Sequence, residues 1–191
     1  MKNKGLVKGF FIGVFLSGSL LFCPRGYSQE AGGELRVVLI RHGEKPRKGD
    51  NLTCQGLNRS LALPAVLYGK FGIPTAIYVP SPGLGDSTKH ARMFETIVPF
   101  AVKYNLALNT SFAEKDSAGI ARAILQRKGV VLVVWEHKAI APIAHALGVK
   151  DGSLKWGDED YDSIWVIRWK NGAAVLEKGS EGLRPGEECN F

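Results

Sequence analysis

Two histidines and two arginines follow apolar segments or loops, where side chains become available for chemistry. Arg41-His42-Gly43-Glu44 comes directly after an apolar run, and His137 lies two residues after another. Arg92 follows a loop that contains two Pro and two Gly residues. A phosphate ester carries close to two negative charges at neutral pH, and the guanidinium of Arg binds its oxygens while keeping its own charge. These residue types therefore suit phosphoryl transfer.

His42 is the expected nucleophile of such a reaction. Histidine attacks phosphorus only as neutral imidazole, and neighbouring Arg side chains lower its pKa and keep it neutral. Its other ring nitrogen is expected to donate to a backbone carbonyl, which fixes the tautomer. His137 is expected to hold the transferring group from the far side. The resulting phosphohistidine is then hydrolysed by water. Three residues are predicted to bind substrate: Gly43, where the backbone can approach the phosphate, Glu44 and Lys45.

The elements that must position these residues alternate along the chain. Apolar and β-branched runs predict strands, and a 3.6-residue apolar period predicts helices. Pro64 is expected to kink the first helix or to mark a second start. Residues 163–169 and 173–177 predict a hairpin around Asn171-Gly172. The other predicted strands are 34–40, 75–79, 107–112 and 130–135, and the predicted helices are 55–71, 89–104, 116–126 and 139–147.

This alternation predicts one three-layer α/β/α sandwich with a mostly parallel central sheet over residues 29–191. Active sites in such folds lie beyond the C-terminal ends of the parallel strands. His42 and His137 both follow such ends. If their strands are neighbours, the two side chains face each other across one pocket, with Arg92 near the same rim.

The segment Leu39-Ile40-Arg41-His42-Gly43-Glu44 resembles the signature of the histidine phosphatase superfamily, which has the phosphoglycerate mutase-like fold. The family's four core residues correspond here to Arg41, His42, Arg92 and His137. Ser81-Pro82 through Arg92, with Glu95-Thr96, resembles the family's middle block, and Leu52-Thr53, Gly56 and Arg59 resemble its first helix start. The resemblance covers about residues 34–167. It implies a phosphoric monoester hydrolase that works through a phosphohistidine, without metal or cofactor.

Some positions depart from the family pattern. Many members have a further Arg just before the Leu-Thr pair, where this chain has Asp50 and Asn51. Arg47 or Lys45 are the available substitutes. Many members also have Gly after the second histidine, where this chain has Lys138. The sequence after Glu44 does not match the glycolytic mutases, so a phosphatase is expected rather than a mutase.

The general acid is the least determined part of the expected site. An alcohol leaving group needs a proton, and general acid catalysis typically contributes about 10²–10⁴-fold. Glu114 is the predicted acid, because it lies where some family members place one. Asp116, Glu136, Glu44 and the acidic run 158–162 are alternatives. Members that dephosphorylate phosphohistidine need little help from an acid.

The first 28 residues have the three parts of a secretory signal. Lys2, Lys4 and Lys8 form a basic start, residues 10–22 are uncharged and apolar, and small residues precede Gln29. We expect cleavage after Ser28 and a periplasmic or secreted protein without a stable membrane span; an uncleaved anchor is the alternative. In an oxidising compartment Cys54 and Cys189 can pair, with two free thiols as the alternative.

Composition limits the classes of partner. The chain is 45% hydrophobic and 23% charged, which is the balance of a globular domain. Its net charge of +7 falls to +3 when the four cations of residues 1–28 are removed. A charge of this size, with no basic stripe, argues against nucleic-acid binding. The expected partner is a small phosphorylated substrate.

Two other functions fit parts of the pattern. One is a metal-dependent hydrolase with His42 and His137 as ligands, although no further ligands have suitable spacing. The other is a non-catalytic module that binds anions or phospholigands in the same pocket. His90 and His145 have no partner in the pattern and are interpreted as structural or solvated. The acidic run 158–160 is interpreted as a solvated loop that could bind a cation weakly.

Overall fold

An unbroken apolar strand forms the middle of the sheet. The computed structural model describes residues 33–83 and 85–189. The predicted signal, residues 1–28, lies outside the described residues. β4 (Val130–Trp135) runs beside β1 (Arg36–Arg41), and all but the first residue of each strand are buried. Such runs, buried on both faces, are typical of central parallel strands.

The sheet has six strands in the order β3-β2-β4-β1-β5-β6. β2 (Ala76–Tyr78) and β3 (Leu108–Asn109) continue the parallel half. β5 (Ser163–Lys170) and β6 (Ala173–Ser180) are antiparallel and form the predicted hairpin. Its turn residues Asn171 and Gly172 both have positive φ, as a two-residue hairpin turn favours. The expectation of a mostly parallel sheet is confirmed.

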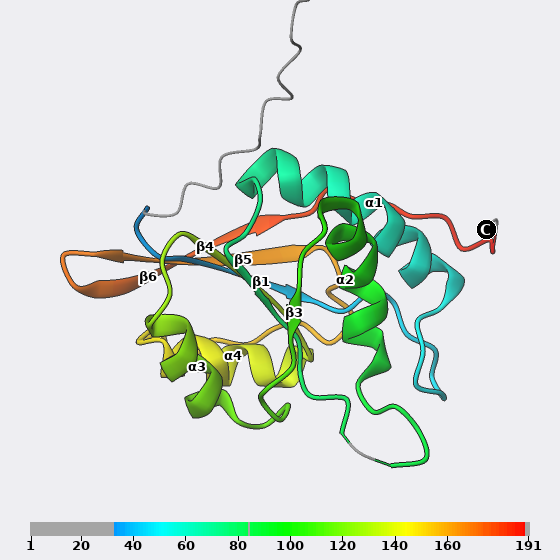
Figure 1. Ribbon diagram of the computed structural model, residues 1–191, viewed down its shortest axis with the longest axis horizontal. Helices are drawn as coiled ribbons and strands as arrows, with labels where there is room; N and C mark the ends of the chain where they lie inside the picture. Colours follow the sequence, from blue (N-terminus) through cyan, green and yellow to red (C-terminus); the bar gives the residue numbers. More distant parts are fainter. Residues whose placement is uncertain (1–32, 84, 190–191) are drawn as a thin grey trace, which may run out of the picture.

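Helices cover both faces of the sheet, which gives the three predicted layers (Figure 1). α1 (Cys54–Phe71) and α2 (Ala91–Tyr104) pack on one face, against the side chains of Val38, Ile40, Leu132 and Val134. α3 (Ser117–Leu125) and α4 (His137–Ala146) pack on the other face, against Val37, Leu39, Val131 and Val133. Alternate residues of the same two strands therefore serve the two cores.

Two helices differ from the sequence expectation. α1 is a single helix that continues through Pro64, so no second start occurs. Leu63 and Leu67 on either side of the proline are buried against the sheet, and this packing holds the helix where one backbone hydrogen bond is lost. α4 begins at His137 rather than Ala139, because the Glu136 side chain caps it by accepting from the Lys138 backbone N–H.

The C-terminal tail lies along α1 beyond β6. The Asn58 side-chain amide donates to the carbonyls of Gly186 and Glu188, at 2.9 and 2.8 Å. Cys54, the first residue of α1, forms a disulfide with Cys189, and their Cα atoms are 5.0 Å apart. Residues 181–189 thus form a strap that is fastened to the start of α1.

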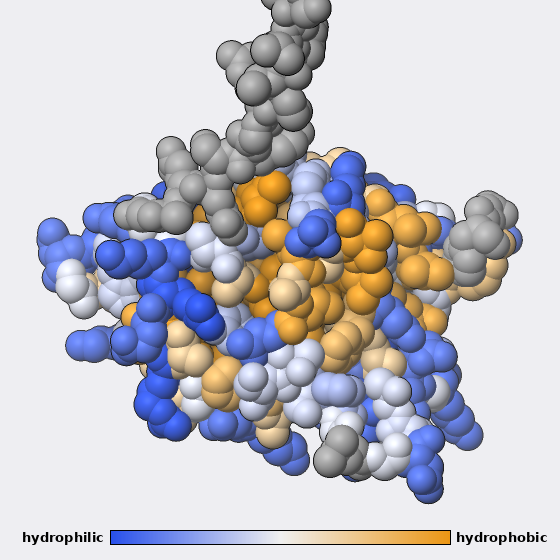
Figure 2. Space-filling model, viewed as in Figure 1, coloured by the Kyte–Doolittle hydropathy of each residue, from blue (hydrophilic) through white to orange (hydrophobic). Residues whose placement is uncertain are grey.

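One face of the molecule is apolar in places. Figure 2 shows apolar side chains gathered over α1 and α2, where Leu61, Val98 and Val102 are exposed. Among the helices of residues 33–83 and 85–189, none is long and apolar enough to cross a membrane.

Candidate active site

The ends of β1 and β4 bring the two predicted histidines together. Arg41 and Trp135 are register partners in the parallel ladder, and the His42 backbone N–H donates to the Trp135 carbonyl at 3.3 Å. His42 and His137 therefore extend from adjacent strand ends at the C-terminal edge of the sheet. The two strands are thus the neighbours that the expected pocket requires.

His42 is buried with one ring nitrogen engaged and the other bare. The side chain is 1% exposed, and its Nδ1 lies 2.7 Å from the Gly43 carbonyl oxygen. A carbonyl can only accept, so Nδ1 carries the proton and Nε2 has a free lone pair. Burial, together with Arg41, Arg92 and His137, lowers the pKa of His42 to about 3, although the bond to Gly43 opposes this. The imidazole is neutral across the physiological range.

The turn after His42 is fixed to α2. The Gly43 backbone N–H donates to the Thr96 hydroxyl at 2.8 Å, and this hydroxyl donates to the Arg92 carbonyl at 2.7 Å. A side chain at Gly43 would meet the Gly56 carbonyl oxygen at 2.8 Å, so this glycine is required by the crossing of the turn and α1. The only role predicted for Gly43 from the sequence was to let the backbone come close to a phosphate.

Arg41 is a buried guanidinium with unused donors. It is 1% exposed, and its Nη1 donates to the carbonyls of Asp158 at 2.5 Å, Asp160 at 3.2 Å and Gly157 at 3.4 Å. The Tyr161 ring lies over the guanidinium, 3.9 Å from its carbon to the ring centroid. Nε and Nη2 are buried and have no hydrogen-bond partner. These free donors on a cationic side chain suit an anion.

Arg92 contributes a second guanidinium from the first turn of α2. Its Nη1 donates to the Gly49 carbonyl at 3.3 Å, and its Nε is buried without a partner. Its charge is among those that lower the pKa of His42. The two arginines predicted from the sequence thus both lower the pKa of His42.

His137 is the first residue of α4 and lies between two carboxylates. Glu136 Oε1 is 2.6 Å from its Nδ1, and Asp158 Oδ1 is 3.2 Å from its Nε2. Burial and then Arg41 lower the pKa of His137, while both carboxylates raise it. The Asp158 side chain is 67% exposed. The position at a helix N-terminus adds backbone N–H groups that favour an anion at the same place.

Glu114, the predicted acid, is held by a different histidine. Its carboxylate lies 2.7 Å from Nδ1 of His90, which caps α2 in the left-handed conformation with φ of 58°. The Glu114 carbonyl accepts from the Trp135 indole N–H at 2.8 Å. Glu114 and Glu136 line one open cavity of about 500 Å³ beside the site. His90, which had no partner in the sequence pattern, therefore has one.

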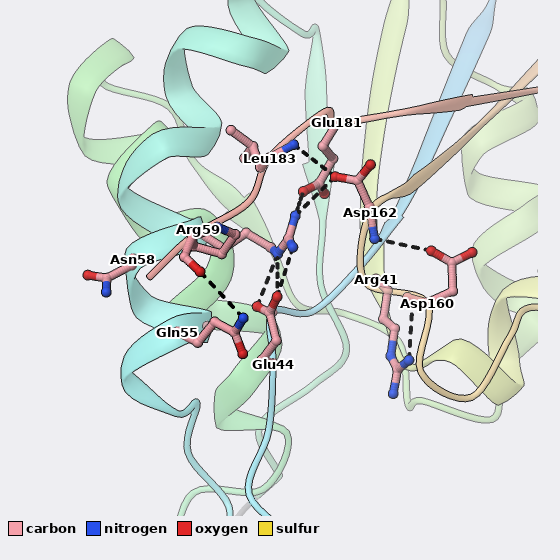
Figure 3. A network of polar contacts seen from close by, with 12 residues as sticks. Arg41, Glu44, Gln55, Asn58, Arg59, Asp160, Asp162, Glu181 and Leu183 are labelled. Atoms are coloured by element: carbon pink, nitrogen blue, oxygen red, sulfur yellow. Dashed lines mark hydrogen bonds and ion pairs between the residues drawn. The ribbon is translucent and has the colours of Figure 1, made fainter. Parts of the chain in front are cut away.

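Glu44 and Lys45 were also predicted to bind substrate, but neither side chain is held in the same way as those of the histidines and arginines described above. The Glu44 carboxylate forms a bidentate pair with Arg59 and is directed toward it (Figure 3). It is therefore engaged within the protein rather than offered to a ligand. Lys45 is exposed on the following loop.

Several site residues were missed by sequence reasoning. Tyr161 and the carbonyls of residues 157–160 surround Arg41, although the acidic run had been interpreted as a solvated loop. Thr96 belongs to the motif noted for its family resemblance, but its contact with the turn after His42 was not predicted. No local pattern marks Tyr161, because its partner is 120 residues away in the sequence.

Metal ligation was the basis of one alternative function. Within residues 33–83 and 85–189, no three His, Cys, Asp or Glu side chains are grouped so that they could share an ion.

Comparison with known proteins identifies the fold. No family model matches the sequence, and no curated protein matches it. SixA from Agrobacterium tumefaciens, described provisionally as a phosphohistidine phosphatase, superposes with a TM-score of 0.56 at 15% identity, over 79% of this chain and 98% of that one. SixA from Nakamurella multipartitia, described in the same way, gives 0.51 at 19% identity, over 78% and 96%. A phosphoglycerate mutase from Bacillus anthracis gives 0.51 at 15%, over 78% and 94%. The chain has the phosphoglycerate mutase-like fold.

Proposed function

We propose that this protein is a phosphatase that hydrolyses a phosphomonoester or a phosphohistidine through a phosphohistidine intermediate on His42. One observation carries the proposal. A neutral histidine with a bare Nε2 lies near two arginines, each of which has at least one buried guanidinium nitrogen without a partner. Unpaired buried donors are rare in folded proteins, and here they surround a nucleophile.

The geometry supports a two-step transfer. The phosphoryl oxygens take the free donors of Arg41 and Arg92, and Nε2 of His42 attacks phosphorus while the bond to the leaving oxygen or nitrogen breaks. The proton stays on Nδ1, which keeps donating to the Gly43 carbonyl, so the ring remains oriented as it becomes phosphorylated. Water then attacks phosphorus, the N–P bond breaks, and neutral His42 is restored.

His137 completes the anion site in this proposal. Its Nε2 now contacts Asp158, whose exposed side chain can leave that position as a phosphoryl group enters. The backbone N–H groups at the start of α4 add to the stabilisation of equatorial charge. Glu114 is the proposed source of the leaving-group proton, held beside the site by His90.

The substrate and the place of action follow as further parts of the proposal. The substrate is a small phosphorylated molecule, and Lys45 on the exposed loop is available to contact its distal part. The basic and apolar N-terminal pattern supports action outside the cytoplasm, in the periplasm or after secretion. The disulfide between Cys54 and Cys189 agrees with an oxidising compartment.

Hydrolysis of p-nitrophenyl phosphate tests the proposal directly. The p-nitrophenolate leaving group needs little protonation, so turnover of this substrate does not depend on which residue is the general acid. We expect turnover by the wild-type protein in the presence of a chelator. His42→Ala should reduce kcat at least 10³-fold, because it removes the nucleophile.

The controls separate the alternatives. His145→Ala removes a histidine on the far end of α4 from His137 and is expected to keep wild-type activity. Loss of turnover on chelation would favour the metal-dependent hydrolase instead. Folded wild-type protein that binds tungstate without turnover would show a non-catalytic phospholigand module.

A further inference from the structure

A buried ion cluster lies directly behind the proposed nucleophile. We infer that Arg59 is a positioning residue, which holds the His42 turn in its reactive geometry by joining that turn to the C-terminal strap. The inference rests on the proposed function. Arg59 is on α1 and does not face the phosphate site, so it acts through Glu44 and not on substrate (Figure 3).

Arg59 contacts three carboxylates from three separate segments. Its Nε lies 3.1 and 3.0 Å from the two Glu44 oxygens, and its Nη2 lies 2.8 Å from Glu44 Oε1. Its Nη1 lies 2.5 Å from Glu181 Oε2 and 3.4 Å from Asp162 Oδ1. The Glu181 side chain is completely buried. Bidentate geometry of this kind fixes direction as well as distance.

Glu44 connects this cluster to the nucleophile. It follows Gly43, whose carbonyl oxygen accepts the hydrogen bond from Nδ1–H of His42. The Glu44 carbonyl in turn accepts from the Thr53 backbone N–H at 2.9 Å, at the cap of α1. The turn is thus fixed at its backbone by the start of α1 and at its side chain by Arg59. A shift of Glu44 would move the carbonyl that sets the tautomer and direction of His42.

Asp162 connects the cluster to Arg41 more weakly. The backbone N–H of Asp162 donates to Asp160 Oδ1 at 3.1 Å, and the Asp160 carbonyl accepts from Arg41 (Figure 3). Asp162 also accepts from the Leu183 backbone N–H at 2.9 Å, at the start of the strap. Because Asp162 is the longest contact of Arg59, we assign the main effect to Glu44.

Charge balance explains why the cluster depends on this one residue. One guanidinium faces three carboxylates from the turn, the strap and the end of the acidic loop. Without the cation, the Glu44 carboxylate would lose its bidentate partner, and the buried Glu181 side chain would lose the guanidinium that its Oε2 contacts. Glu44 would be displaced from its position, and the His42 turn with it. Burial already raises the pKa of Glu181 to about 8 despite Arg59, with Asp162 and Glu44 adding to the effect.

Steady-state kinetics with p-nitrophenyl phosphate separate a positioning role from a structural one. We expect Arg59→Met to lower kcat on the order of 10- to 100-fold, because misplacement of a reacting group by about 1 Å has effects of this size. KM and the tungstate dissociation constant should change less than about threefold, since Arg41 and Arg92 keep their charges. Arg59→Lys, which keeps one ion pair, should recover part of the lost kcat.

Asn58→Ala is the matched control. Asn58 is the neighbouring residue on α1 and holds the same strap, but it contacts only Gly186 and Glu188. It should lower thermal stability while leaving kcat unchanged. If Arg59→Met does not fold, Glu44→Gln keeps the test open, because it weakens the same pair from the other side and should give the same loss in kcat alone.

The outcomes distinguish this inference from the proposed function. An active wild-type protein whose folded Arg59→Met variant keeps its kcat would overturn the positioning role alone. A parallel rise in KM and tungstate dissociation constant would also overturn it, because the residue would then act on binding. A folded wild-type protein without turnover would overturn both.

Discussion

Arg41 and Arg59 are both buried, at 1% and 4% exposure, and they lie on the two sides of the His42 turn. Arg59 is saturated by carboxylates, with every part of its guanidinium engaged. Arg41 is held by backbone carbonyls at Nη1 only, and its Nε and Nη2 remain unpaired. Two arginines that are similarly buried thus differ in role. What distinguishes them is whether all of their guanidinium nitrogens have a hydrogen-bond partner.

The partners explain the difference. Carboxylates neutralise a guanidinium, so the Arg59 cluster has no positive charge available to attract an anionic ligand. Carbonyl oxygens fix the position of Arg41 but carry only partial charges, which leaves most of its positive charge available. A buried cation held by neutral groups is poised for an anion that arrives later. This contrast predicts opposite balances between activity and stability at the two positions.

Arg41→Met should show the largest effect on activity. Loss of a guanidinium that stabilises charge in the transition state should reduce kcat/KM about 10³-fold or more. Its unfolding free energy should fall less than that of Arg59→Met, which leaves buried carboxylates unpaired at a cost of about 3–5 kcal/mol. Enzyme assays and urea unfolding of both variants measure the two quantities.

Arg36→Met supplies the control for this comparison, because Arg36 lies at the opposite end of the same strand. It should keep wild-type activity. A larger loss of unfolding free energy in Arg41→Met than in Arg59→Met would contradict this contrast. A fully hydrogen-bonded guanidinium would then not identify the arginine that stabilises the fold.

The His42 proton provides a second test, on stability. The folded-state pKa of about 3 lies below the ordinary 6.5, so between these values the unfolded chain binds a proton that the folded protein does not. Stability from this group is complete above pH 6.5 and is lost as the pH falls toward 3. At pH 4.5 the loss should be about 3 kcal/mol.

Comparison with His42→Asn isolates this contribution, because Asn can still donate to the Gly43 carbonyl but does not titrate. The difference in unfolding free energy between the two proteins should change by this amount between pH 7.5 and 4.5. A constant difference would mean that His42 takes up protons in the folded protein near its ordinary pKa.

Glu181→Gln should show the smallest effect. Burial raises the pKa of Glu181 from its ordinary 4.5 to about 8, so between these values the folded protein keeps a proton that the unfolded chain has released. Stability from this group is complete below pH 4.5 and is lost as the pH rises toward 8, whereas Gln does not titrate. Between pH 6 and pH 7 the wild type should therefore lose about 1 kcal/mol relative to the variant, as urea unfolding measures. A variant equally destabilised at every pH would show that Glu181 is ionised throughout.

Local patterns were sufficient for the elements and for the core of the site. Residues 130–135 were predicted with the observed bounds, because an unbroken apolar run between polar residues has no other favourable environment. The placement of His42 and His137 followed from the rule for strand ends. These predictions needed only neighbours within a few positions.

Contacts between residues far apart in the sequence could not be predicted from such local patterns. Arg59 finds its carboxylates at positions 44, 162 and 181, and no periodicity links these residues. The early start of α4 was missed because Glu136 is not among the strongly preferred cap residues. Glu44 was interpreted as a ligand residue because the sequence does not reveal that Arg59 already binds it.

The bond between Cys54 and Cys189 turns residues 54–189 into a covalent ring. Of the six strands in the described chain, β1 alone lies outside this ring, although it is inserted between β4 and β5, which belong to it. A single backbone cut between these cysteines therefore leaves the polypeptide in one piece, whereas a cut between His42 and Cys54 separates His42 from the ring. Topologically, the strand that leads into the proposed nucleophile is the detachable part of the sheet.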